Sequence, residues 1–215
     1  MGRYSILYQK VFRKDLYTKQ WEILKANGID SIFWLFSGNK GVGKCAFAEK
    51  WIRYHVRCHD IHCHPNVCVI QSEEEITVDG IQKVRTFLSK KNEEPRFVLI
   101  DNADKMNRFA QNALLKTFEG DYERTSIILI VHNISAVLPT ILSRFQKLPF
   151  VLDEEDIPDN LKLLIPYAGL NMYYLEILSK WGGIDWIEGV KNMWSKNVTS
   201  EEWVKKHAEH ALNVV

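Results

Sequence analysis

A glycine-rich loop constrains this chain more than any other feature. Residues 38–45, GNKGVGKC, match the phosphate-binding pattern G-x-x-x-x-G-K-[ST] at every position except the last. An apolar, β-prone run at residues 31–36 precedes the loop, and a helix over residues 46–56 is expected to follow it. In a strand–loop–helix unit of this kind, backbone N–H groups and the helix N-terminus bind phosphate oxygens.

The nucleotide-binding candidates in the loop are Gly38, Gly41, Gly43, Lys44 and Cys45. The glycines let backbone N–H groups turn toward an anion, and Lys44 reaches the terminal phosphates. The last position is normally a Ser or Thr whose hydroxyl binds Mg²⁺, and the neutral thiol of Cys45 is a poor ligand for that hard cation. We therefore expect a degenerate site in which nucleotide binding stays open, with a glycine turn that binds nothing as the alternative.

Apolar runs and amphipathic segments alternate over the first 150 residues. Strands are expected at residues 31–36, 67–70, 97–100 and 127–131, and helices at residues 8–27, 46–56, 78–89 and 106–118. Strands that alternate with helices are typical of an α/β fold with a parallel sheet. Ligands of such sheets bind at the carboxyl ends of the strands.

The pattern changes near residue 150. The apolar strands stop, and an acidic stretch at residues 153–159 contains Pro158. Further helices are expected at residues 160–167, 172–181, 184–194 and 201–212. The sequence therefore predicts a core domain over residues 1–150 and a small all-helical domain over residues 151–215.

The charge balance argues against extended binding of nucleic acid by this chain alone. Its 28 basic and 27 acidic side chains give a net charge of +1, which cannot neutralise a long run of phosphates. One local basic cluster leaves a direct DNA-binding module as an alternative, although a solvated helix face is the interpretation that we favour. The cluster consists of Lys83, Arg85, Lys90, Lys91 and Arg96.

No apolar run approaches the roughly 20 residues that a membrane helix requires, and the N-terminus has no secretion signal. We expect a cytoplasmic protein with no membrane association. The four cysteines, Cys45, Cys58, Cys63 and Cys68, are accordingly expected to be reduced thiols and not a disulfide framework.

The expected strand at residues 97–100 ends at Asp101, where a carboxylate approaches Mg²⁺ in the Walker B pattern. The next residue is Asn102, which cannot accept a proton and so cannot serve as the base that activates water. Asp101 as a simple helix cap is the alternative.

Three ordered segments carry a resemblance to a known family. They are DNADKMN at residues 101–107, NALLKTFE at residues 112–119 and LPTILSR at residues 138–144. With the glycine loop they resemble the bacterial DNA polymerase III clamp-loader family of AAA+ proteins, and within it the delta-prime branch. The resemblance covers about residues 32–146, and it implies an AAA+ P-loop core followed by a helical lid.

The resemblance implies roles for further residues. Ser143-Arg144-Phe145 stands where the family has a Ser-Arg-Cys motif, whose arginine reaches into a neighbouring subunit's ATP site. Arg144 is thus the candidate arginine finger, and Phe145 leaves the local packing open. His132-Asn133 stands at the first sensor position, and Met172 stands where hydrolysing members carry an arginine.

The family also contains a four-cysteine zinc module after the phosphate-loop helix. Cys58 lies near the position of its first ligand, and Cys63 follows with histidines nearby. Thiolates and imidazoles suit zinc, which makes these two cysteines candidates. The short loop hinders tetrahedral closure, so the absence of a metal is the interpretation that we favour.

We infer a delta-prime-like stator subunit of the clamp loader, within a DNA-directed DNA polymerase holoenzyme, that does not hydrolyse ATP itself. The implied partners are gamma/tau-like motor subunits and the delta subunit, with the sliding clamp and primed DNA reached through the complex. No cofactor is firmly implied, and ATP or ADP with Mg²⁺ is the one that stays open. The alternatives are an ATP-hydrolysing gamma/tau-like motor or another AAA+ ATPase. The family's helical collar domain is expected to be truncated or reduced to the last helices.

Overall fold

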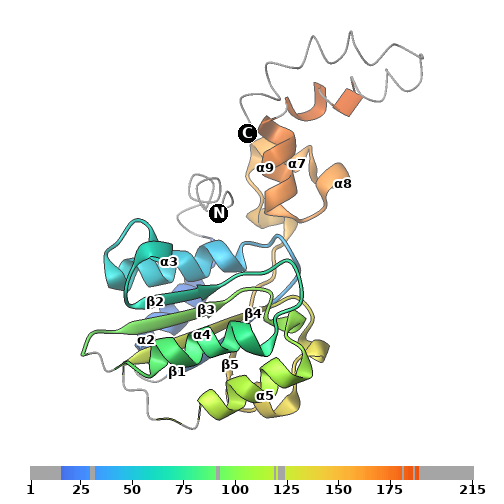
Figure 1. The fold of residues 1–215 in the computed structure, drawn as a ribbon. Coiled ribbons are helices and arrows are strands. Elements are labelled where there is room, and N and C mark those ends of the chain that lie inside the picture. Colours follow the sequence, from blue (N-terminus) through green and yellow to red (C-terminus); the bar gives the residue numbers. More distant parts are fainter. Residues whose placement is uncertain are drawn as a thin grey trace. The chain divides into compact units, whose positions relative to one another are not determined.

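The computed structural model describes residues 16–29, 32–90, 93–118, 120, 124–180, 182–185 and 187–188. The chain forms two compact units, Met1–Val151 and Leu152–Val215, which are described separately. The first unit holds a twisted sheet wrapped by helices, and the second is built from short helices (Figure 1). No described helix is long and apolar enough to cross a membrane.

The elements of the first unit follow the expected alternation. In chain order they are α2 (Thr18–Asn27), β1 (Ile32–Ser37), α3 (Lys44–Val56), η1 (Ile61–Cys63), β2 (Val67–Ile70), α4 (Val78–Leu88), β3 (Arg96–Ile100), η2 (Ala103–Lys105), α5 (Arg108–Thr117), β4 (Thr125–Val131), η3 (Ile134–Ala136), α6 (Pro139–Leu142) and β5 (Gln146–Pro149). Gly28 ends α2 as expected, with a positive φ of 73° and its N–H donated to the carbonyls of Leu24 and Lys25.

The five strands form one sheet in the order β2-β3-β4-β1-β5, and every neighbouring pair is parallel. This confirms the α/β parallel-sheet fold. The order has a consequence for the site, because β4 lies between β1, which leads into the glycine loop, and β3, which leads into Asp101. Residues that follow these three strands therefore meet at one edge of the sheet.

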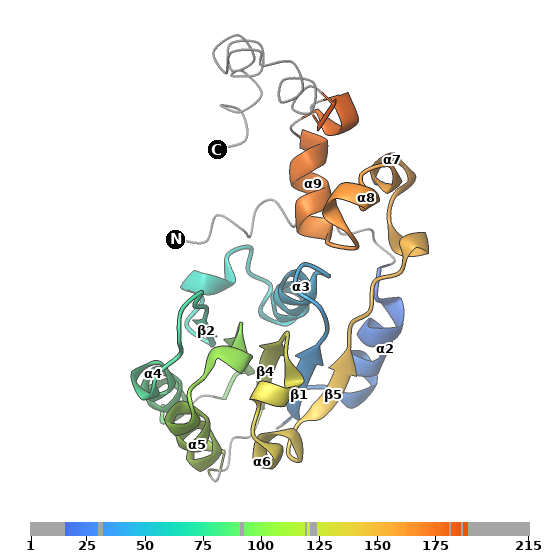
Figure 2. The same ribbon diagram turned by 90° about the vertical axis from the view of Figure 1, so that its right-hand side faces the viewer.

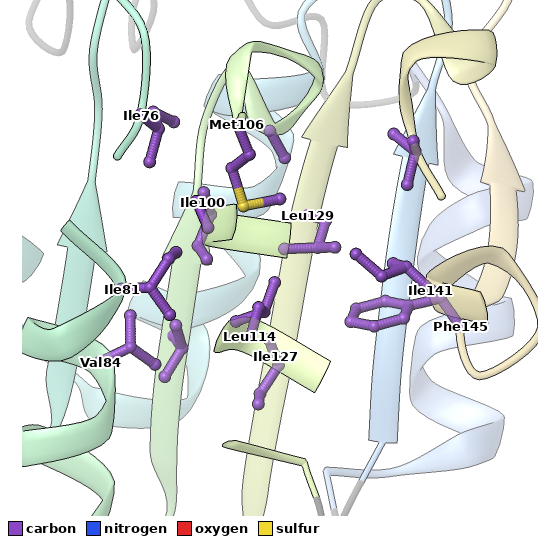
Figure 3. Packing of buried hydrophobic residues seen from close by; sticks show 14 of the residues in the cluster. Ile76, Ile81, Val84, Ile100, Met106, Leu114, Ile127, Leu129, Ile141 and Phe145 are labelled. Carbon is purple, nitrogen blue, oxygen red and sulfur yellow. The ribbon is translucent and has the colours of Figure 1, made fainter. Parts of the chain in front are cut away.

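Helices cover both faces of the sheet (Figure 2). Helices α4, α5 and α6 lie on one face, and α2 and α3 lie on the other. The first face holds a continuous apolar cluster in which Val84 of α4 and Leu114 of α5 are fully buried against Ile127 and Leu129 of β4 (Figure 3). This packing removes the apolar side chains of that face of the sheet from water, which stabilises the fold.

The second face is rich in aromatic side chains. The rings of Phe36 in β1, Phe47 in α3 and Phe150 after β5 lie with centroids 5.0 to 5.9 Å apart. Trp21 of α2 packs edge-on against Trp51 of α3 at 5.2 Å. These tilted and edge-on contacts fix α3, and with it the end of the glycine loop, on the sheet.

Two elements differ from the sequence-based expectation. The sequence did not predict a strand over residues 146–149, but these residues form β5, which pairs with β1 in parallel. This edge strand has only four residues, and its burial pattern exposes all of them except Leu148. Its sequence therefore lacks the apolar run that marked the other strands.

The second unit contains η4 (Glu154–Asp156), α7 (Asp159–Lys162), α8 (Ile165–Ala168) and α9 (Met172–Lys180). The single helix expected over residues 160–167 is wrong, since Pro166 lacks a backbone N–H and disfavours a helix through the preceding turn. The helix expected over residues 201–212, most of that over residues 184–194 and the start of that over residues 8–27 lie outside the described residues. The role of this unit as a lid stays a prediction.

Candidate functional site

The glycine loop between β1 and α3 has the backbone geometry of a phosphate-binding loop. Gly38, Gly41 and Gly43 have φ values of 151°, 86° and 95°, which side chains with a Cβ rarely adopt. Gly38 also lies against the chain after β5, where a Cβ would stand 2.1 Å from the carbonyl oxygen of Phe150. Tyr17 donates its hydroxyl to the carbonyl of Val42 at 2.8 Å and thereby fixes the far side of the loop.

Lys44 at the start of α3 points into the edge of the sheet and is buried. Its ammonium donates to the carbonyl oxygens of Gly38 at 2.7 Å and Asn39 at 2.8 Å, and it contacts Nδ1 of His132 at 2.9 Å. Burial lowers the pKa of Lys44 to about 8, although Asp101 and Asp104 oppose this shift. All three N–H donors of the ammonium thus have acceptors within the protein.

Asp101 follows β3 and is also satisfied by protein groups. Its Oδ1 accepts the N–H of Asn102 at 2.9 Å, and its Oδ2 accepts Nε2 of Gln71 at 3.3 Å. Burial raises the pKa of the Cys45 thiol well above its ordinary value, and the negative charge of Asp101 acts in the same direction. A protonated thiol and an engaged carboxylate are a poor ligand set for Mg²⁺, so the residues present do not fit that ion.

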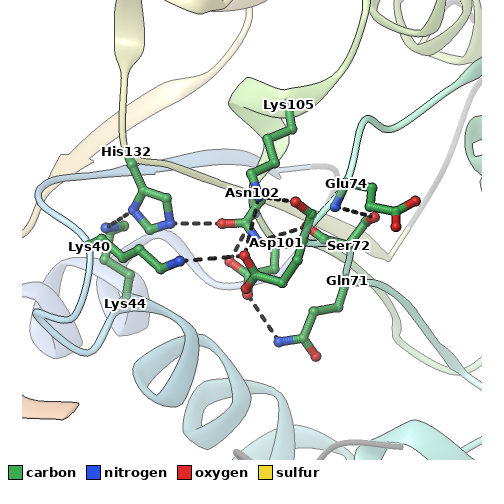
Figure 4. Close-up of polar contacts among 10 residues, drawn as sticks. Lys40, Lys44, Gln71, Ser72, Glu74, Asp101, Asn102, Lys105 and His132 are labelled. Carbon is green, nitrogen blue, oxygen red and sulfur yellow. Dashed lines mark hydrogen bonds and ion pairs between the residues drawn. The ribbon is translucent and has the colours of Figure 1, made fainter. Parts of the chain in front are cut away.

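Asn102 and His132 form the centre of the site (Figure 4). Asn102 has a left-handed conformation with φ 53°, which Asn adopts more readily than most residues. Its Nδ2 donates to the carbonyl of Ser72 at 2.9 Å, and its Oδ1 lies 2.9 Å from Nε2 of His132. The backbone N–H of His132 donates to Oδ1 of Asp104 at 3.1 Å.

Of the two residues at the sensor position, His132 is therefore the one that faces the site. Asn133 instead accepts the N–H of Ser135 and caps η3. Burial lowers the pKa of His132 from 6.5, and the Lys44 ammonium acts in the same direction against Asp104 and Asp101. His132 is accordingly a neutral imidazole at neutral pH.

Sequence reasoning missed the contribution of the segment after β2. Gln71 and the Ser72 carbonyl contact Asp101 and Asn102, and Glu73 forms ion pairs with Lys40 at 3.4 Å and Lys105 at 3.2 Å. A signal was present, because polar residues directly after a parallel strand lie at the edge where ligands bind. Only the strand order, however, places this segment beside β3.

Arg144 is exposed. It follows α6, where its Nη1 donates to the carbonyl of Thr140 at 3.2 Å. Among the residues that the structure describes, Arg144 forms no ion pair. Its charge is therefore available to a group outside this part of the chain.

Phe145, which stands where the resemblance implies a cysteine, is buried next to Arg144. Its ring lies 5.4 Å from that of Phe33 in β1 and 5.3 Å from that of Phe118 after α5. The change at this position thus adds an aromatic anchor to the core beneath the arginine.

Cys58 and Cys63 do not form a metal cluster with other residues in the described ranges. Both thiols lie near Asp60, at 3.4 Å from its carbonyl oxygen and 3.5 Å from its Oδ2 respectively. No group of three or more His, Cys, Asp or Glu side chains within the described part of the chain is arranged to hold a metal ion. All four cysteines are free thiols in the structure.

One residue of the basic cluster predicted from the sequence, Arg96, does not lie on the surface. The guanidinium of Arg96 is buried and donates to the carbonyls of Leu88 at 3.0 Å and Lys90 at 2.6 Å. Arg96 therefore ties β3 to the end of α4 and does not extend a surface for phosphates. Lys83 and Arg85 are exposed on α4, and Lys91 lies outside the described residues. In the second unit, Met172 is buried at the start of α9.

Comparison with known proteins gives a consistent result. The family model described as DNA polymerase III, delta subunit, matches residues 14–153. The DNA polymerase III subunit delta' of Pseudomonas aeruginosa is 30% identical over 154 residues, which cover 60% of this chain and 47% of that protein. The DNA polymerase III subunit gamma of Buchnera aphidicola from Schizaphis graminum is 28% identical over 157 residues, covering 64% and 43%.

A structural comparison agrees on the fold. A gamma subunit-related protein of Thermotoga maritima superposes with a TM-score of 0.52 at 19% identity, covering 82% of this chain and 62% of that one. At this identity the likeness concerns the fold alone. The chain spans less than half the length of the delta' and gamma relatives that it matches.

Proposed function

The chain belongs to the family described as DNA polymerase III, delta subunit, and we propose that it acts as a delta-prime-like stator of a clamp loader in DNA replication. In this role the chain does not hydrolyse ATP. It places Arg144 in the ATP site of a neighbouring motor subunit. Its proposed partners are gamma/tau-like motor subunits and a delta subunit, and through them the sliding clamp and primed DNA.

The observation that carries the proposal is a contrast between two sites on the same unit. At the glycine loop, the groups that would act on a nucleotide already have hydrogen-bond partners within the protein. Lys44 contacts His132, and Asp101 accepts a hydrogen bond from Gln71. At the other site, Arg144 is exposed and forms no ion pair with any described residue. This contrast supports a subunit that acts on a neighbour's nucleotide and not on its own.

Asn102 adds a chemical reason. A carboxamide has no basic site for a proton, so Asn102 cannot activate water for attack on a γ-phosphate. Its two polar atoms are moreover engaged by Ser72 and His132. Hydrolysis in this site would need another base, and His132 has its Nδ1 directed at an ammonium group.

The second candidate is an ATP-hydrolysing motor, which the similarity to gamma subunits favours. Under that alternative, Cys45 would be tolerated and the nucleotide would bind with Mg²⁺. The two candidates differ in what the isolated chain does with ATP.

The test is the ATPase rate of the purified chain with ATP and Mg²⁺, together with calorimetric titration of the same nucleotide. A stator should show no turnover above the level of a Lys44→Met variant. Turnover at the typical enzymatic rate of about 1 s⁻¹ or more, lost in Lys44→Met, would establish the motor and reject the stator. Cys45→Thr serves as a matched variant, since it restores the hydroxyl but leaves Asn102 in place.

A further inference from the structure

The contacts of His132 fix which of its ring nitrogens carries the proton. Asn102 donates its Nδ2 to the Ser72 carbonyl, which can only accept, so its Oδ1 must face His132. Nε2 of His132 is therefore the N–H donor of the ring. Nδ1 keeps a lone pair, and this lone pair faces the Lys44 ammonium at 2.9 Å.

A directed chain of hydrogen bonds follows from this assignment. The Lys44 ammonium donates to Nδ1 of His132, Nε2–H of His132 donates to Asn102, and Asn102 donates to the Ser72 carbonyl. These hydrogen bonds connect the segments that follow β1, β4, β3 and β2, because these four strands are neighbours in the order β2-β3-β4-β1. Each of these three hydrogen bonds joins two groups of the protein, and none requires a ligand.

His132 is held by a hydrogen bond of its backbone as well as by the two hydrogen bonds of its ring. The N–H of His132 donates to the Asp104 carboxylate at 3.1 Å, and Asp104 precedes Lys105, which pairs with Glu73. The backbone of His132 is thereby anchored, and a turn of the ring away from Lys44 would break its bond to Asn102 as well. A positioned neutral acceptor against a buried ammonium is a strong, charge-assisted contact.

We propose that His132 is a built-in competitor for Lys44, so that phosphate groups bind the loop of this chain only when they displace the imidazole from the ammonium. The inference goes beyond the proposed function, because it concerns the phosphate-binding loop, whose geometry is set by Gly38, Gly41 and Gly43, and not Arg144. The loop is kept in its folded geometry by the protein's own acceptor. His132 is a positioning residue in this account, because it acts through Lys44.

The probe for this inference is inorganic tripolyphosphate, with ATP in EDTA as a second ligand, titrated into the full chain at neutral pH. Removal of the imidazole leaves one ammonium donor without its acceptor, and a phosphate oxygen can replace it. The His132→Ala variant should bind tripolyphosphate about tenfold more tightly than the original chain. The gain should disappear when Lys44→Met is added.

A matched control is His55→Ala. His55 is a second half-buried imidazole, but its ring packs on Trp51 and Phe97, away from the loop. His55→Ala should leave tripolyphosphate binding unchanged. The inference is overturned if His132→Ala binds no more tightly than the original chain, including the case in which neither binds.

A second measurement decides the question even if His132→Ala does not fold. Nitrogen NMR of the histidine side chains should show His132 as the neutral Nε2–H form at pH 7. Apart from Asn102, the groups that face this ring among the described residues are Lys44, Asp101, Asp104 and the Gly38 carbonyl, and of these Lys44 carries the positive charge. Lys44→Met should therefore raise the pKa of His132, and an unchanged or lower pKa would overturn the inference.

The proposed function and this inference are tested by different experiments, so either can be rejected without the other. The binding and NMR measurements use the chain alone, whereas the role of Arg144 requires a neighbouring subunit. A chain that binds tripolyphosphate without regard to His132 can still donate Arg144. A chain that obeys the His132 prediction can still lack any effect on a neighbour.

Discussion

Gly38 lies against Phe150 so closely that a Cβ on the glycine would stand 2.1 Å from the Phe150 carbonyl oxygen. The two residues belong to the glycine loop and to the segment after β5, and their contact closes the edge of the sheet beside Lys44. Even the smallest side chain at Gly38 must displace backbone, which cannot move as a flexible side chain does.

Gly38→Ala should therefore lower the free energy of unfolding by about 2 to 4 kcal/mol, since overpacking adds to the strain of a positive φ. Gly28→Ala is the matched control, because Gly28 has φ 73° but nothing within 4 Å of its Cβ position. It should cost only the strain of its own backbone region, about 1 to 3 kcal/mol, and therefore less than Gly38→Ala. Urea denaturation of both variants measures the difference, and equal losses would show that the contact with Phe150 is unimportant.

Phe145 should stabilise the core beneath Arg144. Phe145→Ala removes a buried ring that packs on Phe33 and Phe118, and large cavities of this kind cost about 3 to 5 kcal/mol. Phe109→Ala is the control, since Phe109 is 76% exposed on α5 and should change stability by no more than about 0.5 kcal/mol. Similar losses in the two variants would contradict the packing described here.

Gln111 joins α5 to the segment that leads to Arg144. This buried amide donates to the carbonyls of Met106 and Ala136 and accepts the N–H of Leu138 at 2.7 Å. Gln111→Leu should cost about 2 to 3 kcal/mol, because it leaves buried backbone groups without partners. Gln82→Leu at an exposed position of α4 should cost much less, and thermal unfolding compares the two.

The lowered pKa of Lys44 makes the stability of the fold depend on pH, in a direction that follows from the shift. Its pKa is lowered from 10.5 to about 8 in the folded chain, so the unfolded chain binds more protons between these values. The contribution of Lys44 to stability should rise with pH from about 8 to 10.5, at no more than about 1.4 kcal/mol per pH unit. The difference between the original chain and Lys44→Met measures this contribution, and a difference that is flat or falls over that range would contradict the burial of the ammonium.

The sequence predicted most strands and helices of the first unit because their residues are apolar in long runs or at helical spacing. It failed at β5, where the strand is short and mostly exposed, and at residues 160–167, where Pro166 divides the helix. At β5 the pairing with β1 decides the structure, and at residues 160–167 the proline does.

For the site, the motif spacing identified Lys44, Asp101 and Asn102 as neighbours, and the structure brings them together. It could not predict the bonds from His132 to Lys44 and Asn102, because these depend on β4 lying between β1 and β3. The contribution of Gln71 was missed for the same reason. Contacts between residues far apart in the chain follow from strand order, which the sequence pattern leaves open.

The central claim is that the chain acts through Arg144 on a neighbour's nucleotide. The most direct measurement is the ATPase rate of a complex reconstituted from this chain and gamma-type motor subunits, with Arg144→Ala compared with Lys147→Ala. Lys147 is exposed on β5 three residues away, so its loss removes the same charge.

An arginine finger contributes about a thousandfold or more to hydrolysis at the site that it enters. Arg144→Ala should thus remove essentially all ATP turnover at the motor site that faces this chain, while Lys147→Ala leaves the rate of the complex unchanged. An assembled complex whose ATPase rate is the same with Arg144→Ala as with the original chain would contradict the account.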